Sequence, residues 1–452
     1  MLEEFCGKKV LVIGAGLSGR AAAVFLAGKG AAAVLADNKK ADELEGLDEL
    51  RAAGVELCLG GMPQDTSVFA LAVISPGVPL EIPVVESLQK DGVPLIGELE
   101  LAYRCSHNPY LAITGTNGKT TTTTLLGYIL RQSGRRCLVG GNIGAALVND
   151  VEALPEDACV VAELSSFQLE TAVTFRSHIA SFLNLTPDHL YRHHTMENYG
   201  AIKAKIFAHQ TADDYAVLNY DDPLVRAYVD ELTGTVVFFS RKEVLPQGMF
   251  VENGKMIWQW NGERTEVIAA DDILIKGPHN LENALAAAAM AVLYGVPVDD
   301  VRAALMSFPG VPHRQEPVGE VNGVLYINDS KGTNPDSTLM ALAACTRPTV
   351  LILGGFSKGS DFSPLLPLIR QHVKHIVLVG ETADVIAGTL TEGGFTAFEH
   401  AGYDFEKCVR MAAAAAQPGD AVLLSPACAS WDMFKSFEQR GDVFRQLVAD
   451  MA

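Results

Sequence analysis

A glycine-rich segment in the first third of the chain carries a lysine and several hydroxyls in the spacing of a phosphate-binding loop. It follows the apolar run Tyr110–Ile113 and opens a helical pattern. Backbone N–H groups of such a loop point at phosphate oxygens, and the dipole of the following helix favours an anion. Lys119 would reach the β- and γ-phosphates of a nucleotide, and the Thr120 hydroxyl would hold Mg²⁺. Residues predicted to bind ATP here are Gly115, Thr116, Asn117, Gly118, Lys119, Thr120 and Thr121.

The loop has the shorter G-x-x-G-K-T form of this motif, because Ile113 stands where the longer form has glycine. A plain glycine turn with a solvated lysine is the simpler interpretation. The order strand, loop, helix favours the phosphate-binding interpretation.

Two further side chains could hold a metal ion beside this loop. Glu163 ends the apolar run Cys159–Ala162, and His189 follows the next predicted strand, Ala180–Leu185. Ligands of open α/β sheets bind outside the carboxyl ends of the strands, so the two side chains could share one metal. Taken alone, Glu163 could equally be a surface acid, and a lone histidine is more often structural than a ligand.

A lysine falls on the apolar face of a predicted helix. At 100° per residue, Tyr199, Ile202, Ile206 and Phe207 form one face, and Lys203 lies within it. Burial would depress the pKa of the amine and make it reactive. From periodicity alone, the expected outcome is that Lys203 extends its ammonium out to solvent.

The first strand of the chain, Lys9–Ile13, leads into a second glycine-rich turn, Gly14–Gly19. Asp37 ends the next strand, Ala33–Ala36, at about 20 residues' distance, which is the spacing of a ribose-binding acid. On its own, this pattern predicts a dinucleotide cofactor.

Short apolar runs alternate with helical patterns throughout, which predicts parallel sheets with helices on both faces. Asn253-Gly254 and Asn261-Gly262 between apolar-rich runs predict a small antiparallel patch within 235–275. We therefore expect an α/β protein of three domains: an N-terminal Rossmann-like domain over 1–100, a central P-loop ATPase-like domain over 101–308, and a C-terminal Rossmann-like domain over 309–452.

The composition of the chain indicates which partners and which cellular location to expect. The formal net charge of −19 repels phosphate backbones, so we expect no nucleic-acid partner. The eight cysteines include no C-x-x-C pair, which favours reduced thiols. Without a basic leader or an apolar stretch of about 18 residues, the chain is expected to be a cytoplasmic, monomeric enzyme that inserts in no membrane.

Several of these motifs together resemble the Mur ligase family. They are Gly115–Thr121, Glu163–Gln168, Asp188-His189, His279-Asn280-x-x-Asn283 and His313-Arg314. The C-terminal runs Ser425–Ser430 and Phe437–Gly441 resemble the D-glutamate-adding branch in particular. The matches span the whole chain in the family's order.

The resemblance implies ATP and two Mg²⁺ ions as cofactors. Thr120, Glu163, His189 and Lys203 would be the metal ligands, with Lys203 carbamylated by CO₂. A carbamate beside Mg²⁺ is a paired charge, which would account for a lysine on an apolar face.

The resemblance also implies which residues contact the adenine and the rest of the ATP molecule. Asn280 and Asn283 would contact adenine, with His279 nearby, although a helix N-cap followed by surface amides is the simpler interpretation. Arg314 would reach ATP, and Asp329 would lie by the γ-phosphate.

Two substrates are implied, UDP-N-acetylmuramoyl-L-alanine and D-glutamate. By resemblance the UDP-sugar contacts Gly16, Leu17, Ser18, Asp37, Ser75, Gly77, Asn142, Ser166 and Gln168. D-glutamate would be held by Thr333, Lys358, Ser430 and Phe437. The implied catalytic residues are Lys119, Lys203, His189, Lys331 and Lys358.

One position departs from the family. The pattern D-H-x-D has Tyr191 in place of its second acid, so the role of that acid is open here, and His193 and His194 stay unassigned. The implied reaction forms an acyl phosphate on the alanyl carboxylate, which the amine of D-glutamate then attacks. The alternatives are another Mur-type or folylpolyglutamate-type ligase, a nucleotide-dependent oxidoreductase and a non-catalytic ATP-binding module.

Overall fold

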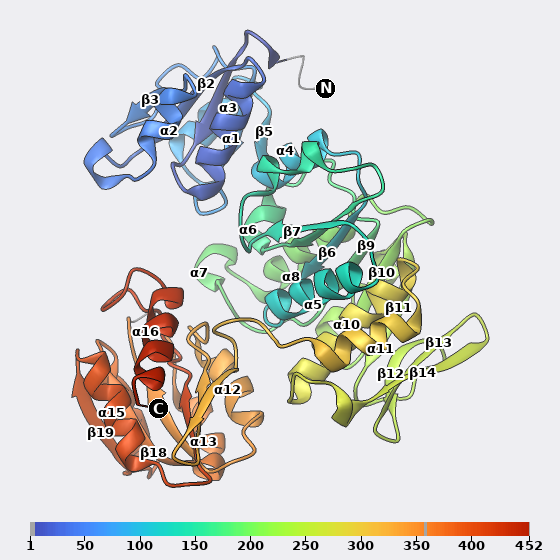
Figure 1. Cartoon of the computed structure of the whole chain (residues 1–452). Coiled ribbons are helices and arrows are strands. Elements are labelled where there is room, and N and C mark those ends of the chain that lie inside the picture. Colours follow the sequence, from blue (N-terminus) through green and yellow to red (C-terminus); the bar gives the residue numbers. More distant parts are fainter. Residues whose placement is uncertain (1–4, 357–358, 452) are drawn as a thin grey trace. The chain divides into compact units, whose positions relative to one another are not determined.

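The computed structural model describes residues 5–356 and 359–451. Along this part of the chain three β-sheets follow one another, and helices cover both faces of each (Figure 1). This is the predicted three-domain α/β architecture. Within the described ranges, no helix is both long and apolar enough to cross a bilayer.

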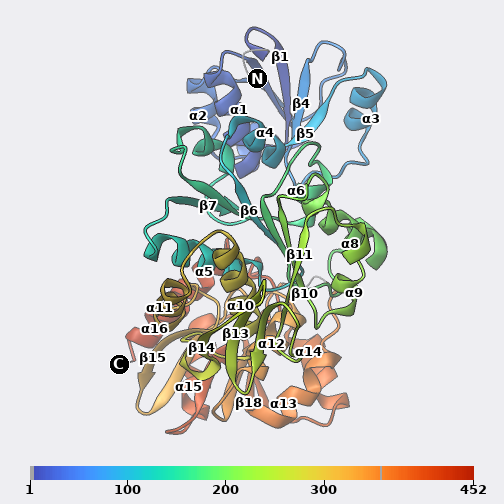
Figure 2. The ribbon, with the colours of Figure 1, turned by 90° about the vertical axis from the view of Figure 1, so that its right-hand side faces the viewer.

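The first sheet is entirely parallel, in the order β3-β2-β1-β4-β5. Its strands are β1 (Lys9–Ile13), β2 (Ala32–Asp37), β3 (Glu56–Leu59), β4 (Leu71–Ile74) and β5 (Leu95–Gly97). One face is covered by α1 (Leu17–Gly28), α2 (Leu47–Ala52) and α4 (Glu98–Cys105), and the other by α3 (Pro83–Lys90) (Figure 2). The strand order reverses between β1 and β4, and such a switch point is where open α/β sheets bind ligands.

The second sheet has nine strands, in the order β14-β13-β12-β11-β10-β9-β6-β8-β7. They are β6 (Tyr110–Thr114), β7 (Cys137–Gly141), β8 (Cys159–Glu163), β9 (Ile179–Phe182), β10 (Tyr215–Asn219), β11 (Thr235–Ser240), β12 (Gly248–Glu252), β13 (Lys255–Trp260) and β14 (Glu263–Ala269). Its helices are α5 (Lys119–Gln132), α6 (Ser166–Glu170), α7 (Leu190–His193), α8 (Met196–Ala204), α9 (Pro223–Arg226), α10 (Pro278–Leu293) and α11 (Val298–Ser307). Because β6 lies between β8 and β9, the loops after these three strands meet at one edge.

The predicted antiparallel patch is confirmed as β12, β13 and β14, and it extends the same sheet through a parallel pairing of β11 with β12. Both Asn-Gly pairs form its turns. Asn253 and Gly254 have φ of 51° and 74°, and Asn261 and Gly262 have 50° and 84°. Two successive positive φ values match the twist of a two-residue hairpin, and Asn and Gly adopt them at least cost.

The third sheet follows the order β15-β16-β20-β17-β18-β19, with only the edge strand β15 antiparallel. Its strands are β15 (Glu316–Val321), β16 (Val324–Asn328), β17 (Thr349–Leu353), β18 (Val373–Val379), β19 (Phe398–Gly402) and β20 (Ala421–Leu424). Helices α12 (Pro335–Ala343), α13 (Leu366–His372) and α14 (Ala383–Glu392) pack on one face, and α15 (Phe405–Ala415) and α16 (Phe437–Ala449) pack on the other.

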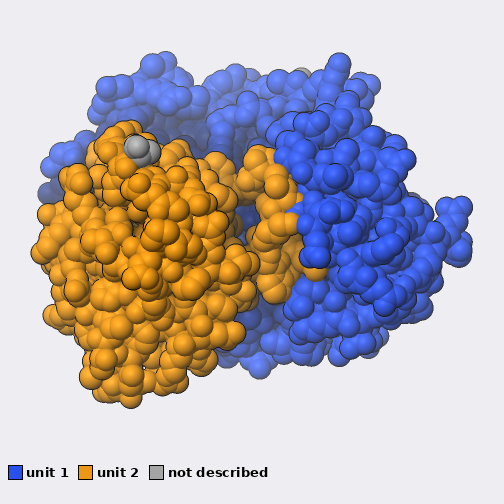
Figure 3. Space-filling view, turned by 60° about the horizontal axis from the view of Figure 1, so that its bottom comes forward, with its two compact units in different colours: residues 1–273, 282–307 blue, residues 274–281, 308–452 orange. Residues whose placement is uncertain are grey.

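The chain forms two compact units (Figure 3). The first comprises residues 1–273 and 282–307, and the second comprises 274–281 and 308–452. The first unit holds two of the sheets and the second holds one. The boundaries at 100 and 308 stay predictions.

One strand ends earlier than predicted. The apolar run 180–185 forms β9 only as far as Phe182. Beyond it, Leu183 N donates to Thr114 O, and Leu185 N donates to the Asp222 carboxylate at 2.8 Å. These loop contacts hold the backbone after Phe182 and account for the early end of the strand.

Helix α4 buries an acid whose charge opposes folding. Glu98 is 2% exposed and accepts a hydrogen bond from Val148 N at 2.8 Å. Desolvation raises the pKa of Glu98 from 4.5 to about 7. Between these values the unfolded chain has released the proton that the folded chain keeps, so this residue's contribution to stability falls as pH rises from 4.5 to 7.

We therefore expect Glu98→Gln to stabilise the protein at pH 8. Glutamine keeps an acceptor for Val148 without the buried charge, and the gain should be on the order of 2 kcal/mol. At pH 4.5 the two proteins should differ by less than about 0.5 kcal/mol. Urea unfolding at both pH values measures this, and an equal effect at both would contradict it.

Candidate active site

The predicted phosphate loop lies at the carboxyl end of β6 and runs directly into α5. Gly118 has φ of 83°, a left-handed conformation, and a β-carbon there would overlap the Asn283 side chain. Both conformation and space therefore require glycine at position 118. The first turn of α5 directs its backbone N–H groups toward the loop, as in other anion-binding helix starts.

The loop is fastened to the segment that follows β9. Thr116 N donates to Asn184 O at 3.0 Å, and Asn117 N donates to Asn184 Oδ1 at 2.8 Å. Asn184 Nδ2 returns a hydrogen bond to Asn117 O at 3.1 Å. These amides are occupied, so the amides that begin α5 are the ones directed at a phosphate. No sequence signal pointed to Asn184, because its partner lies 67 residues away.

Two lysines converge on one carbonyl oxygen of this loop. Lys119 Nζ donates to Gly115 O at 2.9 Å and to Thr116 O at 2.7 Å. Lys203 Nζ donates to the same Gly115 O at 2.8 Å. The charge of Lys119 disfavours a second cation this close, so it opposes protonation of the Lys203 amine.

The expectation that Lys203 reaches solvent is wrong. The residue is 1% exposed, and its Nζ lies 4.6 Å from the centre of the Tyr199 ring. Burial, reinforced by the nearby Lys119, holds the pKa of the Lys203 amine well below its ordinary value. Lys205, two residues later, is the exposed lysine of this segment. Helical periodicity predicted the face of the helix on which Lys203 lies. It could not predict how completely other residues bury the side chain.

Glu163 ends β8 beside the loop, as predicted, and is 2% exposed. Its Oε1 accepts a hydrogen bond from Asn142 Nδ2 at 2.9 Å, while its buried Oε2 has no hydrogen-bond partner among the described residues. Asn142, expected to contact the UDP-sugar, therefore orients the acid in this structure. A buried carboxylate oxygen without a donor is what a hard cation would satisfy.

His189 begins the short helix α7 in a left-handed conformation, with φ of 51°. Its ring packs on Phe167 at 4.9 Å between centroids, and its Nδ1 lies 3.3 Å from the Tyr191 hydroxyl. Tyr191 thus occupies the place of the family's second acid and contacts the imidazole itself. Its Nε2 lies 3.5 Å from Asp188 Oδ2.

These residues fit a magnesium site only if Lys203 is modified. No three His, Cys, Asp or Glu side chains of residues 5–356 and 359–451 gather as a metal site would require. Glu163 offers a carboxylate oxygen of the kind that Mg²⁺ prefers, His189 offers an imidazole nitrogen, and Thr120, in the first turn of α5, is 6% exposed. A carboxylated Lys203 would supply the missing anionic oxygen.

A buried histidine joins this region to the predicted substrate residues. Ser166 Oγ lies 2.9 Å from His193 Nε2, and His193 Nδ1 lies 3.4 Å from Glu170 Oε1. Burial lowers the pKa of His193 to about 4, so the ring is neutral at pH 7. The ring also stacks on Tyr199 at 5.1 Å. His193 was unassigned from sequence, and this network depends on three separate elements.

Arg192 connects this network to the loop that follows β4 of the first sheet. It pairs with Glu170, lies 4.4 Å from the centre of the Phe167 ring, and donates to Val78 O at 3.0 Å. Gln168 is 4% exposed and forms a capping box with Ser165 at the start of α6. Its side-chain oxygen is therefore occupied by Ser165, and only its amide nitrogen is left for a substrate.

The N-terminal glycine turn is folded as a nucleotide-binding turn. Asp37 at the end of β2 accepts hydrogen bonds from Ala15 N at 2.7 Å and Lys39 N at 2.9 Å. Ser75 Oγ donates to Gly14 O at 3.0 Å across the β1–β4 switch point. A β-carbon on Gly19 would overlap Gly14 O, so close packing of α1 requires glycine. The predicted contacts Gly16, Leu17, Ser18 and Gly77 lie around this turn.

The asparagines at the start of α10 are buried, so their interpretation as surface amides is wrong. Asn283 is 5% exposed, and its Oδ1 lies 3.3 Å from Thr122 Oγ1 of α5. Asn280, in the second unit, is 8% exposed and donates to Lys276 O at 2.8 Å. His279 Nε2 lies 2.8 Å from Gln315 Nε2. Burial lowers the pKa of His279 to about 4, which keeps the ring neutral.

In the second unit, Asp329 follows β16 and is buried. It accepts hydrogen bonds from Ser425 Oγ at 2.7 Å and Gln315 N at 3.1 Å. Burial raises the pKa of Asp329 to about 6, against the opposing charge of Arg314. Arg314 Nε is itself buried without a hydrogen-bond partner among the described residues. The Arg314 guanidinium therefore keeps a donor for a ligand.

Arg440 organises the predicted amino-acid end of this unit. It is 1% exposed and donates to Ser330 O at 2.8 Å, Cys428 O at 3.1 Å and Ala429 O at 3.3 Å. Burial lowers the pKa of Arg440 to about 10, so it stays charged at pH 7. Arg440 therefore connects the loops that follow β16 and β20. No role for this residue was predicted from the sequence.

The predicted D-glutamate residues lie around these loops. Ser430 is 1% exposed, and its Oγ has no partner among the described residues. Lys331 Nζ lies 5.4 Å from the centre of the Phe437 ring, and Thr333 N donates to Lys331 O. Lys358 lies outside the residues that the structure describes.

Comparison with known proteins covers the full chain. Residues 8–97 match the MurD-like N-terminal domain of Mur ligases, 113–291 match the Mur ligase middle domain, and 313–428 match the Mur ligase glutamate ligase domain. A UDP-N-acetylmuramoylalanine–D-glutamate ligase of Pelotomaculum thermopropionicum is 50% identical over 453 residues, which is 100% of this chain and 99% of that one. The ligase of the same name from Alkaliphilus oremlandii is 45% identical over 98% of both chains.

Solved structures share the fold at lower identity. The MurF ligase of Thermotoga maritima in complex with ADP is 18% identical, with a TM-score of 0.61 over 93% of this chain and 96% of that one. The UDP-N-acetylmuramate–alanine ligase MurC of the same organism is also 18% identical, with a TM-score of 0.61 over 98% and 100%. By its domains and its full-length relatives, the chain belongs to the Mur ligase family.

Proposed function

We propose that this chain joins D-glutamate to UDP-N-acetylmuramoyl-L-alanine at the expense of ATP, as a monomer in the cytoplasm. The observation that carries the proposal is the 50% identity, over the whole chain, to a ligase of that name. The geometry of the phosphate loop and its two lysines agrees with it.

The first turn of α5 and the residues around it would position ATP. The amides of the first helical turn and Lys119 would meet the phosphates, and the buried amide of Asn283 lies against the same helix through Thr122. Within the second unit, Arg314 is the proposed ATP contact, since its buried Nε has no hydrogen-bond partner among the described residues. The protein thus offers fixed donors where charge develops.

Metal binding would fall to Thr120, Glu163, His189 and a carbamylated Lys203. The neutral amine that burial favours is the form that reacts with CO₂, and the product is a carboxylate in place of a buried cation. When bound, Mg²⁺ neutralises charge on the phosphates. The support for carbamylation is the burial of Lys203 and the unpartnered Glu163 Oε2.

The first step transfers the γ-phosphoryl group of ATP to the alanyl carboxylate. One carboxylate oxygen forms the bond to phosphorus, and ADP leaves with the electrons of the broken P–O bond. Lys119 and the start of α5 hold the phosphates for an in-line approach. Ser166, fixed by His193 at 2.9 Å, would orient the UDP-sugar substrate beside Phe167 and His189.

The second step joins the amino acid. The amine of D-glutamate attacks the acyl carbon, inorganic phosphate leaves, and the amine loses a proton. Lys331, Thr333, Lys358, Ser430 and Phe437 would hold D-glutamate. The charged Arg440 would act indirectly, by holding the loops after β16 and β20 in place. Ser430 would offer the substrate a buried hydroxyl that has no hydrogen-bond partner among the described residues.

An amino-acid panel tests the function. ADP release is measured with ATP, Mg²⁺ and UDP-N-acetylmuramoyl-L-alanine in the presence of D-glutamate, L-glutamate, L-alanine or diaminopimelate. D-glutamate should stimulate release at least about 100-fold more than the others, because specific polar recognition rejects analogues that leave buried groups unpaired. Equal stimulation by L-alanine or diaminopimelate would assign the chain to another branch of the family.

A further inference from the structure

A cavity of about 700 Å³ opens at the edge of the central sheet where β6, β9 and β10 begin. Its wall comes from the end of α4, the loop before β6, and the segments that precede β9 and β10. The side chains of this wall include two arginines, two histidines and two tyrosines. They are Tyr103, Arg104, His107, Tyr110, Arg176 and His178.

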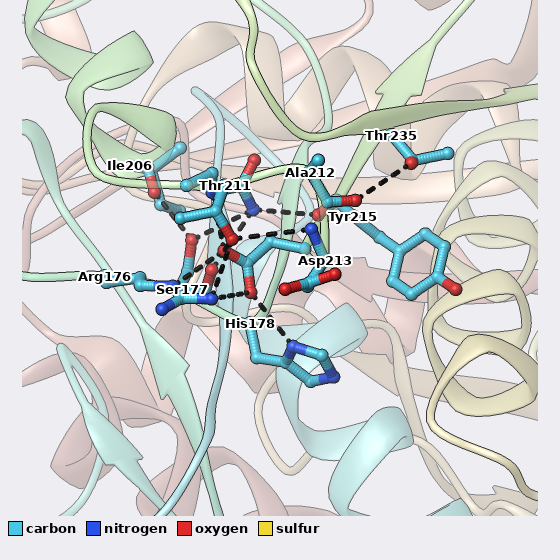
Figure 4. Close-up of polar contacts among 11 residues, drawn as sticks. Arg176, Ser177, His178, Ile206, Thr211, Ala212, Asp213, Tyr215 and Thr235 are labelled. Carbon is cyan, nitrogen blue, oxygen red and sulfur yellow. Dashed lines mark hydrogen bonds and ion pairs between the residues drawn. The ribbon is translucent and has the colours of Figure 1, made fainter.

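The two acids of this region are already saturated with donors. Asp214 accepts from Arg176 Nε at 2.7 Å, from His178 Nδ1 at 3.1 Å and from Thr211 N at 2.8 Å. Figure 4 labels these three donor residues. Glu100 behind the wall accepts from Arg104 Nε at 2.8 Å and from three backbone amides of 173–175. The oxygens of both carboxylates already accept hydrogen bonds, so neither Asp214 nor Glu100 is expected to bind a cation or a further donor.

The arginines, in contrast, keep donors directed elsewhere. Arg104 uses only its Nε, and Arg176 uses Nε and Nη2, so both Nη groups of Arg104 and Nη1 of Arg176 have no partner among the described residues. Both side chains are partly exposed, at 23% and 41%. The wall therefore offers guanidinium donors and few acceptors, which selects for an anion.

The floor of the cavity is aromatic. Tyr103 and Tyr110 meet edge to face at 5.6 Å between centroids, and both pack on Phe175. Tyr110 is 1% exposed, and its hydroxyl is a buried polar atom without a hydrogen-bond partner among the described residues. Tyr103 is partly exposed, and its ring beside guanidinium groups suits a ligand with a flat apolar body.

The cavity is separate from the phosphate loop. Tyr110 begins β6, and the loop leaves the other end of that strand, after Thr114. Five strand residues span roughly 16 Å at about 3.3 Å each. None of the residues that line the cavity belongs to the predicted ATP, UDP-sugar, D-glutamate or metal sets.

We propose that this cavity is a second ligand site, which binds a small organic anion with a flat apolar body and one carboxylate. The guanidinium edges of Arg104 and Arg176 bind the carboxylate, and the partly exposed Tyr103 ring contacts the apolar body. The site does not depend on the ligase reaction proposed above.

Calorimetric titration of the full chain tests the site. Saturating Mg²⁺-ADP and D-glutamate occupy the reaction site, and the probes are benzoate, phenyl phosphate and the neutral isostere benzamide. The test protein is the double variant Arg104→Gln/Arg176→Gln. The matched control is Arg136→Gln, since Arg136 is an exposed arginine paired with Asp157 elsewhere on the same unit.

Benzoate should bind the wild type and the control alike, and at least about tenfold more weakly to the double variant, since a charged hydrogen bond is lost. Benzamide should bind at least about tenfold more weakly than benzoate. Tighter binding of phenyl phosphate would make the natural ligand a phosphate ester. If the double variant is unfolded, each single variant should weaken benzoate binding at least about threefold. Unchanged affinity in the folded variants, equal binding of benzamide, or binding of neither anion would overturn the proposal.

Discussion

Lys119→Ala is expected to lower kcat/KM for ATP-dependent ligation by about 10³-fold or more, because it removes the cation proposed to meet the transferred phosphoryl group. The protein stays folded. Lys119 bonds two loop carbonyls, and one of them, Gly115 O, still accepts from Lys203. The free energy of unfolding should therefore change by less than about 1.5 kcal/mol.

ADP release and urea unfolding of the same preparations measure the two effects. Lys242→Ala is the matched control, since Lys242 is exposed and lies in the same unit. Retention of more than a tenth of wild-type turnover in Lys119→Ala would mean that this loop does not hold the reacting phosphate.

Lys203→Ala should lower turnover by roughly 10²- to 10³-fold, because the proposed carbamate would lose the anionic oxygen that it gives to magnesium. Lys203→Arg should be equally inactive, since arginine keeps the charge but forms no such carbamate. Millimolar formate or acetate should restore part of the activity of Lys203→Ala, as a small carboxylate can enter the space that the side chain leaves. The exposed neighbour Lys205→Ala serves as the control.

Native mass spectrometry of the wild type in bicarbonate checks the chemistry directly. A mass increase of one CO₂ should be present in the wild type and the Lys205→Ala variant and absent from Lys203→Ala. A fully active Lys203→Arg variant would contradict the carbamate, whatever the mass spectrum shows.

The sequence was sufficient to predict features that depend on residues close together along the chain. The strands Thr349–Leu353 and Ala421–Leu424, the two Asn-Gly hairpin turns and the order strand, glycine loop, helix are all local patterns, and the structure has them as predicted. Buried parallel strands are recognisable because their apolar runs are continuous. The family resemblance likewise rests on short motifs in a fixed order.

The sequence was insufficient where a role depends on what packs around a side chain. The depth of Lys203 follows from the Tyr199 ring and the carbonyl of Gly115, which lies 88 residues away. The clamp by Asn184 and the link between Ser166 and His193 depend on loops that meet only in the folded sheet. Periodicity reports direction around a helix, and burial depends on the rest of the fold.

The most direct test follows an oxygen atom. UDP-N-acetylmuramoyl-L-alanine labelled with ¹⁸O in its alanyl carboxylate is turned over with ATP and D-glutamate, and the released phosphate is analysed by mass spectrometry. An acyl phosphate intermediate predicts one ¹⁸O atom in each inorganic phosphate, because the carboxylate oxygen that attacks phosphorus leaves with it. Phosphate without ¹⁸O would show that the carboxylate is never phosphorylated and would contradict the account.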